Sequence, residues 1–151
     1  MAANIYHPND FQIILKRINH ISEHSIRLWG KMSLPQMLEH CAIQLKMGLG
    51  IIPESPAEGS LLYRTILGRW LSIYILPWPK GFETPKAMDM YANNAQVPDA
   101  AAGKAVLIQL LKLTVHREQL APHPFYGAMG KRDWGRLIWV HLDHHLRQFS
   151  N

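Results

Sequence analysis

Hydrophobic residues recur along this chain at the three- and four-residue spacing of helices, in segments separated by proline and glycine. Four long segments follow this pattern, at residues 10–28, 33–48, 99–119 and 131–149. No segment alternates hydrophobic and polar positions with a period of two, so a sheet is not expected. The pattern predicts an all-α fold, most simply a four-helix bundle.

A fifth apolar segment, residues 60–76, predicts an extra helix inserted between the second and third helices of the bundle. It contains Arg64 and Arg69, and it is shorter than the roughly 20 apolar residues that a membrane-spanning helix needs. We therefore expect a buried or half-buried helix. The proline-rich stretch 77–85 must be irregular, because proline lacks a backbone donor and restricts the residue before it.

Capping residues mark the start of the first two helices. Asn9 or Asp10 is suited to cap the first helix. For the second helix, Ser33 precedes Gln36 by three residues, which predicts a capping box, and Gly48 marks the end. The start of the second helix is therefore defined more clearly than that of the first.

The composition indicates one globular domain that spans residues 1–151. Hydrophobic residues make up 48% and charged residues 18%, which is ordinary for a folded protein. The first residues resemble no secretory signal, so a cytoplasmic location is expected. Cys41 is the single cysteine, which excludes an internal disulfide and cysteine-rich zinc motifs, and we expect it to be buried in apolar surroundings.

The formal net charge of +5 does not by itself indicate a partner. The basic residues are scattered along the chain, and no nucleic-acid-binding motif accompanies them. We therefore expect a solvated basic surface, with neither a nucleic acid nor a membrane as partner. A cleft that attracts an anionic substrate is the alternative.

Three histidines form the candidate for chemistry. His141 and His145 are four residues apart, so on a helix they lie one turn apart on the same face. His40 of the second helix can complete a three-histidine site for a transition metal, with coordination positions left open for water or substrate. An isolated pair with this spacing is more often found at the surface or hydrogen-bonded in the core.

Other polar residues near these positions are candidates for supporting contacts. Gln44 shares the face of His40, and Gln148 shares the stripe of His141 and His145. His123 lies between two prolines, where it would reach the site as a supporting or substrate contact, or else cap a helix end. His144 lies off the stripe and is expected to face solvent or a neighbouring helix.

The chain resembles the DinB-like (DinB/YfiT) superfamily, and within it an uncharacterised branch of bacterial proteins. The resemblance rests on WGKMS at 29–33, QMLEHC at 36–41, HPFYG at 123–127, WG at 134–135 and HLDHHLRQF at 141–149. It implies a DinB/YfiT-type four-helix bundle in which His40, His141 and His145 hold a divalent metal, nickel or zinc. The long segment 51–96 departs from the pattern and would reshape or cover the mouth of the site.

The resemblance implies a metal-dependent enzyme, such as an S-transferase that acts with a low-molecular-weight thiol, because metal coordination favours the thiolate. A metal-assisted hydrolase is one alternative, with Glu39 or His123 as the base. A non-catalytic, metal-stabilised binding protein is another. Exposed side chains at Trp70, Tyr74 and Trp78 would then form an interface, for example in a homodimer, whereas burial, the commoner outcome, would place them in the core.

Overall fold

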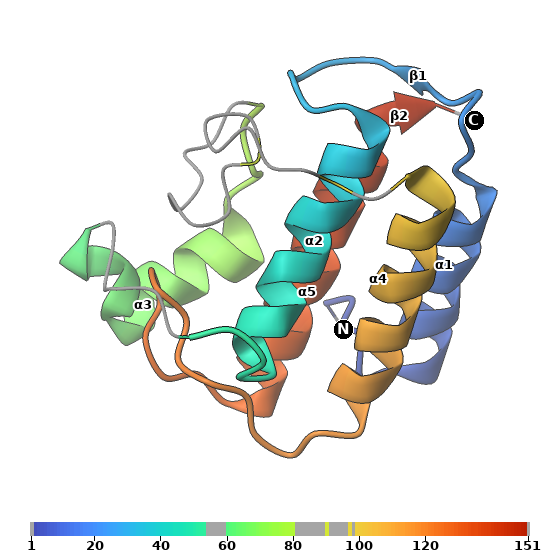
Figure 1. The fold of residues 1–151 in the computed structure, drawn as a ribbon. Helices are drawn as coiled ribbons and strands as arrows, with labels where there is room; N and C mark the ends of the chain where they lie inside the picture. Colours follow the sequence, from blue (N-terminus) through green and yellow to red (C-terminus); the bar gives the residue numbers. More distant parts are fainter. Residues whose placement is uncertain (1, 54–59, 81–89, 91–96, 98, 151) are drawn as a thin grey trace.

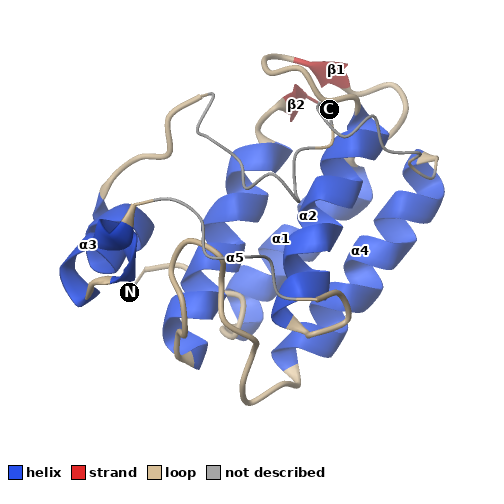
Figure 2. Cartoon of the chain, turned by 60° about the vertical axis from the view of Figure 1, so that its left-hand side comes forward, coloured by secondary structure: helices blue, strands red, loops and turns tan. Residues whose placement is uncertain are grey.

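The computed structural model describes residues 2–53, 60–80, 90, 97 and 99–150. In this part of the chain the fold is all-α, as predicted, with one short two-stranded ribbon (Figure 2). The elements are α1 (Pro8–His20), β1 (Ile26–Arg27), α2 (Leu34–Gly48), the 3-10 helix η1 (Leu61–Arg64), α3 (Ile66–Trp70), the π-helical turn η2 (Leu71–Ile75), α4 (Ala100–Val115), α5 (Lys131–Leu146) and β2 (Phe149–Ser150).

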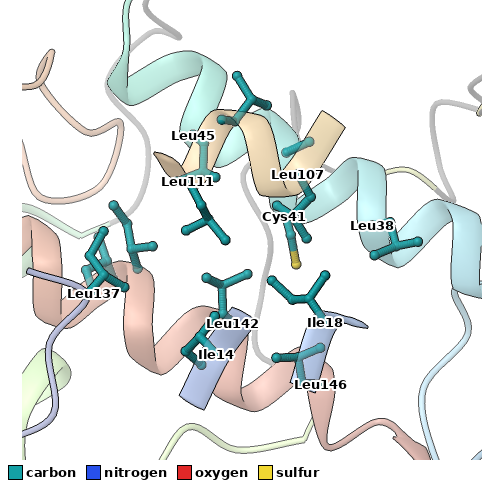
Figure 3. Packing of buried hydrophobic residues seen from close by; sticks show 14 of the residues in the cluster. Ile14, Ile18, Leu38, Cys41, Leu45, Leu107, Leu111, Leu137, Leu142 and Leu146 are labelled. Atoms are coloured by element: carbon teal, nitrogen blue, oxygen red, sulfur yellow. The ribbon is translucent and has the colours of Figure 1, made fainter. Parts of the chain in front are cut away.

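The four long helices α1, α2, α4 and α5 lie side by side and share one hydrophobic core (Figure 1). α2 contacts α4 and α5, and α1 contacts the same two helices from the other side. Each helix buries an apolar stripe, and removal of these stripes from water is the main stabilising contribution. The core residues labelled in Figure 3 are Ile14, Ile18, Leu38, Cys41, Leu45, Leu107, Leu111, Leu137, Leu142 and Leu146.

The capping box predicted for α2 is present. The Ser33 hydroxyl accepts a hydrogen bond from the Gln36 backbone N–H at 3.3 Å, and the Ser33 N–H donates to the Gln36 side chain at 2.8 Å. The helix ends at Gly48, and Gly50 then adopts a φ of 70°, a left-handed conformation that favours glycine. These signals fix the position of α2, which carries His40.

The predicted cap of α1 is wrong. The helix begins at Pro8 with His7 at the N-cap position, and His7 makes no side-chain capping bond. Proline suits the first turn because that turn needs no backbone donor. The Asp10 carboxylate accepts instead from the Asn4 backbone N–H at 2.9 Å, and it contacts His7 Nδ1 at 3.1 Å. Asp10 therefore fastens the N-terminal segment to α1.

Three predicted helix ends extend too far. α1 stops at His20 instead of residue 28, α4 at Val115 instead of 119, and α5 at Leu146 instead of 149. The residues beyond α1 and α5 form strands β1 and β2, which pair antiparallel with Ile26 opposite Ser150. The expectation of no sheet thus misses this ribbon, because two-residue strands are too short to show alternation.

The prediction for residues 60–76 is also wrong in part. The segment divides into η1, α3 and η2, and Thr65 between η1 and α3 has an extended backbone conformation. Ser72 and Ile73 are its buried side chains, whereas most of its large apolar side chains are exposed. Residues 77–80 are irregular, as predicted, and the rest of the proline-rich stretch lies outside the described residues. Among the described helices, none combines the length and hydropathy needed to cross a membrane.

The N-terminal segment crosses α5 closely at Gly135. The Ile5 N–H donates to the Gly135 carbonyl oxygen at 3.2 Å, and the Asn4 side chain donates to the Arg132 carbonyl oxygen at 2.9 Å. A Cβ atom at Gly135 would overlap the side chains of Asn4 and Tyr6. Glycine is therefore required at this crossing.

We predict that Gly135→Ala lowers the free energy of unfolding by about 2 kcal/mol or more, although alanine is the better helix former. The added methyl group must displace a segment that buries Ile5. Urea denaturation followed by circular dichroism measures the change. Gly130→Ala is the matched control, since a Cβ there meets no atom within 4 Å. Equal stability of the two variants would contradict the close crossing.

Candidate metal centre

The packing of α2 against α5 brings the three predicted histidines together. Gly48 near the end of α2 lies beside Trp134 near the start of α5, and His40 lies beside His141. The two helices therefore run antiparallel, which sets the relative heights of their side chains. His40 comes from α2, and His141 and His145 come from adjacent turns of α5.

The three imidazole rings form a compact buried triangle. Their centroids are 4.8 Å apart for His40 and His141, 4.5 Å for His40 and His145, and 4.6 Å for His141 and His145. Each ring offers one nitrogen such that the three nitrogens lie within 4.8 Å of one another. This set of three buried histidines could hold a metal ion.

The separation between the His40 and His141 nitrogens can be compared with that in a coordinated site. Zinc–nitrogen bonds of 2.0–2.1 Å in a tetrahedral site place neighbouring nitrogens about 3.3 Å apart. The Nε2 atoms of His40 and His141 are 2.8 Å apart, a hydrogen-bond distance, and the other pairs lie within the 4.8 Å limit. An ion held by both rings would therefore require these two Nε2 atoms to move apart, which breaks their hydrogen bond.

Burial keeps the imidazoles of α5 neutral. It lowers the pKa of His141 well below the usual value, and the nearby His145 and His40 rings lower it further. Burial likewise lowers the pKa of His145, as does His40, while the bond to Gln148 opposes this change. A neutral imidazole is the form that binds a metal, so protons compete little for these nitrogens near neutral pH.

Gln148 orients His145. Its side-chain oxygen lies 2.9 Å from His145 Nδ1, and because an amide oxygen only accepts, Nδ1 carries the proton. The lone pair of His145 is then on Nε2. Gln148 is itself buried, and its backbone carbonyl oxygen accepts a hydrogen bond from the Leu28 N–H at 2.7 Å. Gly30 lies against its side chain, because a Cβ at Gly30 would be 2.9 Å from the side-chain nitrogen. Metal-ligating histidines usually have a partner of this kind.

Gln44 lies one turn after His40 on α2 and is buried. Among the described residues its side-chain oxygen has no hydrogen-bond partner, and neither has His141 Nδ1. A buried polar atom without a hydrogen-bond partner lowers the stability of the folded protein. Each of these two atoms can form one further hydrogen bond. The supporting role of Gln44 stays a prediction.

His123 is buried outside the triangle. Its Nδ1 accepts from the Phe125 N–H at 3.1 Å, and its ring packs 5.4 Å from that of Trp134. The ring therefore serves a tight loop and caps no described helix, so that alternative is wrong, while a supporting contact to the site stays a prediction. Burial lowers the pKa of His123 to about 3, with a further contribution from Arg64.

Two tryptophan rings lie beside the triangle, and the sequence does not predict them there. His144 is buried, and its ring lies 4.8 Å from that of Trp29 and 6.0 Å from that of Trp78. Trp78 also lies 6.0 Å from the His141 ring, and both tryptophans are half-buried. Trp29 belongs to a motif that the sequence already marks, but nothing in its spacing indicates that it lies near α5.

The nearby acidic side chains and the cysteine are engaged elsewhere. Glu39 pairs with Lys46 at 2.7 Å, and Asp143 pairs with Arg17 at 2.6 Å. Cys41 is buried in the core, as predicted, and burial raises the pKa of its thiol. Among the described residues, the group that could hold a metal therefore consists of imidazoles alone.

These features define a helical protein with a buried three-histidine cluster. The family of proteins of unknown function called DUF1569 matches residues 6–151. The chain belongs to this family. No curated protein and no solved structure matches the chain.

Histidine burial should make the stability of the metal-free protein depend on pH. The unfolded chain takes up a proton at His123 below about pH 6.5, whereas the folded protein, with its pKa of about 3, does not. The contribution of this residue to stability is therefore complete above that pH and is lost as the pH falls, by about 2 kcal/mol at pH 5.

Urea denaturation at about pH 7.5 and at pH 5, in the presence of a chelator, measures this effect. The loss of stability between the two pH values should be about 2 kcal/mol smaller in His123→Gln than in the native protein. An identical loss in both proteins would show that His123 is not buried in the neutral form.

Proposed function

We propose that this protein binds a divalent transition-metal ion, nickel or zinc, through His40, His141 and His145. The observation that carries this proposal is the convergence of three buried imidazoles from two antiparallel helices. An arginine in place of any one of them would disfavour it, because its guanidinium carries a positive charge and has no lone pair to give. The bond between His145 and Gln148 supports the proposal, since it directs the Nε2 lone pair away from Gln148.

We propose further that the fold is a DinB-like four-helix bundle with an insertion between its second and third helices. In support, α1, α2, α4 and α5 share one core, and η1, α3 and η2 follow α2 and precede α4. A metal site between facing helices is a usual feature of bundles. The chain order of the three histidines also fits the motifs of that superfamily.

The reaction we propose is a metal-dependent transfer to or from a low-molecular-weight thiol. Three protein ligands leave coordination positions open, and a divalent ion there would favour the thiolate form of a coordinating thiol. The neutral histidine set leaves the charge of the ion uncompensated, which suits an anionic ligand. The net charge of +5 acts in the same direction.

The alternatives have less support. Hydrolysis needs a base near the ion, but Glu39 pairs with Lys46, and the low pKa of His123 makes it a weak base. A non-catalytic role, in which the ion stabilises the contact between α2 and α5, needs no feature beyond the triangle. Metal binding without any reaction with thiols would favour that role.

The first test is the metal content of protein purified without a histidine tag. Elemental analysis by plasma mass spectrometry should find close to one nickel or zinc per chain, and much less in His40→Ala, His141→Ala and His145→Ala. His144→Ala is the matched control, because it removes an adjacent imidazole of α5 outside the triangle. A native protein that remains metal-free after incubation with nickel, zinc and manganese would contradict the proposal.

The thiol reaction has a separate test on cobalt-substituted protein. A coordinating thiol should produce a new charge-transfer band in the absorption spectrum, which His145→Ala should lack. Simple anions such as azide serve as the comparison, since they report open coordination positions without sulfur chemistry. A response to azide but not to thiols would retain the metal site and exclude the thiol reaction.

A further inference from the structure

Residues 61–76 carry seven large apolar side chains that are exposed. We call this set the apolar face, and it consists of Leu61, Leu62, Ile66, Leu67, Trp70, Ile75 and Leu76, which are between 49% and 82% exposed. Large apolar side chains concentrated in one short segment are unusual on a protein that remains free in water. Such a surface indicates a partner.

An ordinary surface helix turns its apolar side chains toward the core and its polar side chains toward solvent. In this segment the arrangement is reversed, because its polar groups bind the rest of the protein. Arg64 donates to the Pro124 carbonyl oxygen at 2.5 Å, and Arg69 donates to the Ala128 carbonyl oxygen at 2.7 Å. Tyr74 donates to the Asp133 carboxylate at 2.9 Å. These bonds fix the segment with its apolar side chains toward solvent.

The charges behind the apolar face are mostly positive. Residues 60–80 contain three basic residues, Arg64, Arg69 and Lys80, and no acidic residue. The first turns of α5, which contact η2, add Lys131, Arg132 and Arg136 to the single acidic residue Asp133. Arg132 is exposed and lies 5.6 Å from the centre of the Tyr74 ring. Arg69 pairs with Asp133 at 3.4 Å, and Lys131 pairs with Glu118 at 3.1 Å. With these two pairs counted as neutral, Arg64, Lys80, Arg132 and Arg136 leave an excess of positive charge.

We propose that the apolar face docks on an anionic membrane surface. Interfacial segments combine an apolar side that enters the headgroup region with basic side chains that meet anionic lipids, and tryptophan and tyrosine favour that depth. Leucine, isoleucine and Trp70 supply the first part. The exposed Arg132 beside Tyr74 supplies the second, within the excess of positive charge around it. Two copies of this chain docked face to face would instead bring two positive surfaces together. The proposal replaces the expectation of no membrane partner and does not depend on the metal.

The test is sedimentation of the full chain with lipid vesicles. Native protein should bind mixed phosphatidylcholine–phosphatidylglycerol vesicles, should bind phosphatidylcholine alone weakly, and should lose affinity in high salt. Leu61→Asp combined with Ile66→Asp should weaken binding on the order of tenfold or more. The matched control is Ile13→Asp combined with Leu113→Asp, which adds the same charge at exposed apolar positions of α1 and α4 and should keep most of the affinity.

A second pair of variants tests the charge. Arg132→Gln should weaken binding about fivefold, whereas Lys112→Gln on the exposed side of α4 should have little effect. No binding of native protein to anionic vesicles at low salt overturns the proposal. So does an equal loss in the two double variants, which indicates charge attraction without docking of the apolar face. A dimer in analytical ultracentrifugation that dissociates only in the Leu61/Ile66 variant, with no vesicle binding, would assign the face to a second copy.

Discussion

The antiparallel contact between α2 and α5 is the constraint on which the candidate site depends. Helices that run in opposite directions at this contact place Gly48 beside Trp134 and His40 beside His141. A shift by one turn, about 5.4 Å, would separate the imidazoles beyond the reach of one ion. The core residues on both sides of the contact hold the register, since Leu38, Cys41 and Leu45 pack into the same core as Leu142 and Leu146. Ordinary apolar packing therefore does the work of positioning the histidines.

Burial of three imidazoles has an energetic cost, which polar contacts offset in part. A buried polar group that loses water without a new partner destabilises a protein by about 1–3 kcal/mol. His145 recovers part of this through Gln148, and the Nε2 atoms of His40 and His141 share one hydrogen bond. His141 Nδ1 and the Gln44 oxygen recover nothing from the described residues. A cluster held at this cost is easier to understand as a binding site than as part of the core.

The sequence predicts the helices well and their boundaries less well. Ser33 and Gln36 define the start of α2 because a capping box is a local interaction, and the spacing of His141 and His145 fixes their shared face. The ends of α1 and α5 depend on the β1–β2 pairing between residues far apart in the chain, which leaves no local signal. Periodicity does not show whether other parts of the chain cover an apolar segment. The prediction for residues 60–76 therefore buries more side chains than the structure does. Trp29 and Trp78 meet His144 only through tertiary packing.

The position of the triangle along the chain has a consequence for protein synthesis. His40 and His141 are 101 residues apart, and His141 and His145 both belong to α5, which is made after every other long helix. A nascent chain that has exposed α1, α2 and α4 therefore presents a single imidazole of the set, which is too weak a ligand to retain an ion. The apolar stripes of those helices also lack the helix that completes their core. The three-histidine set can therefore form only after α5 has been made and has packed against α2.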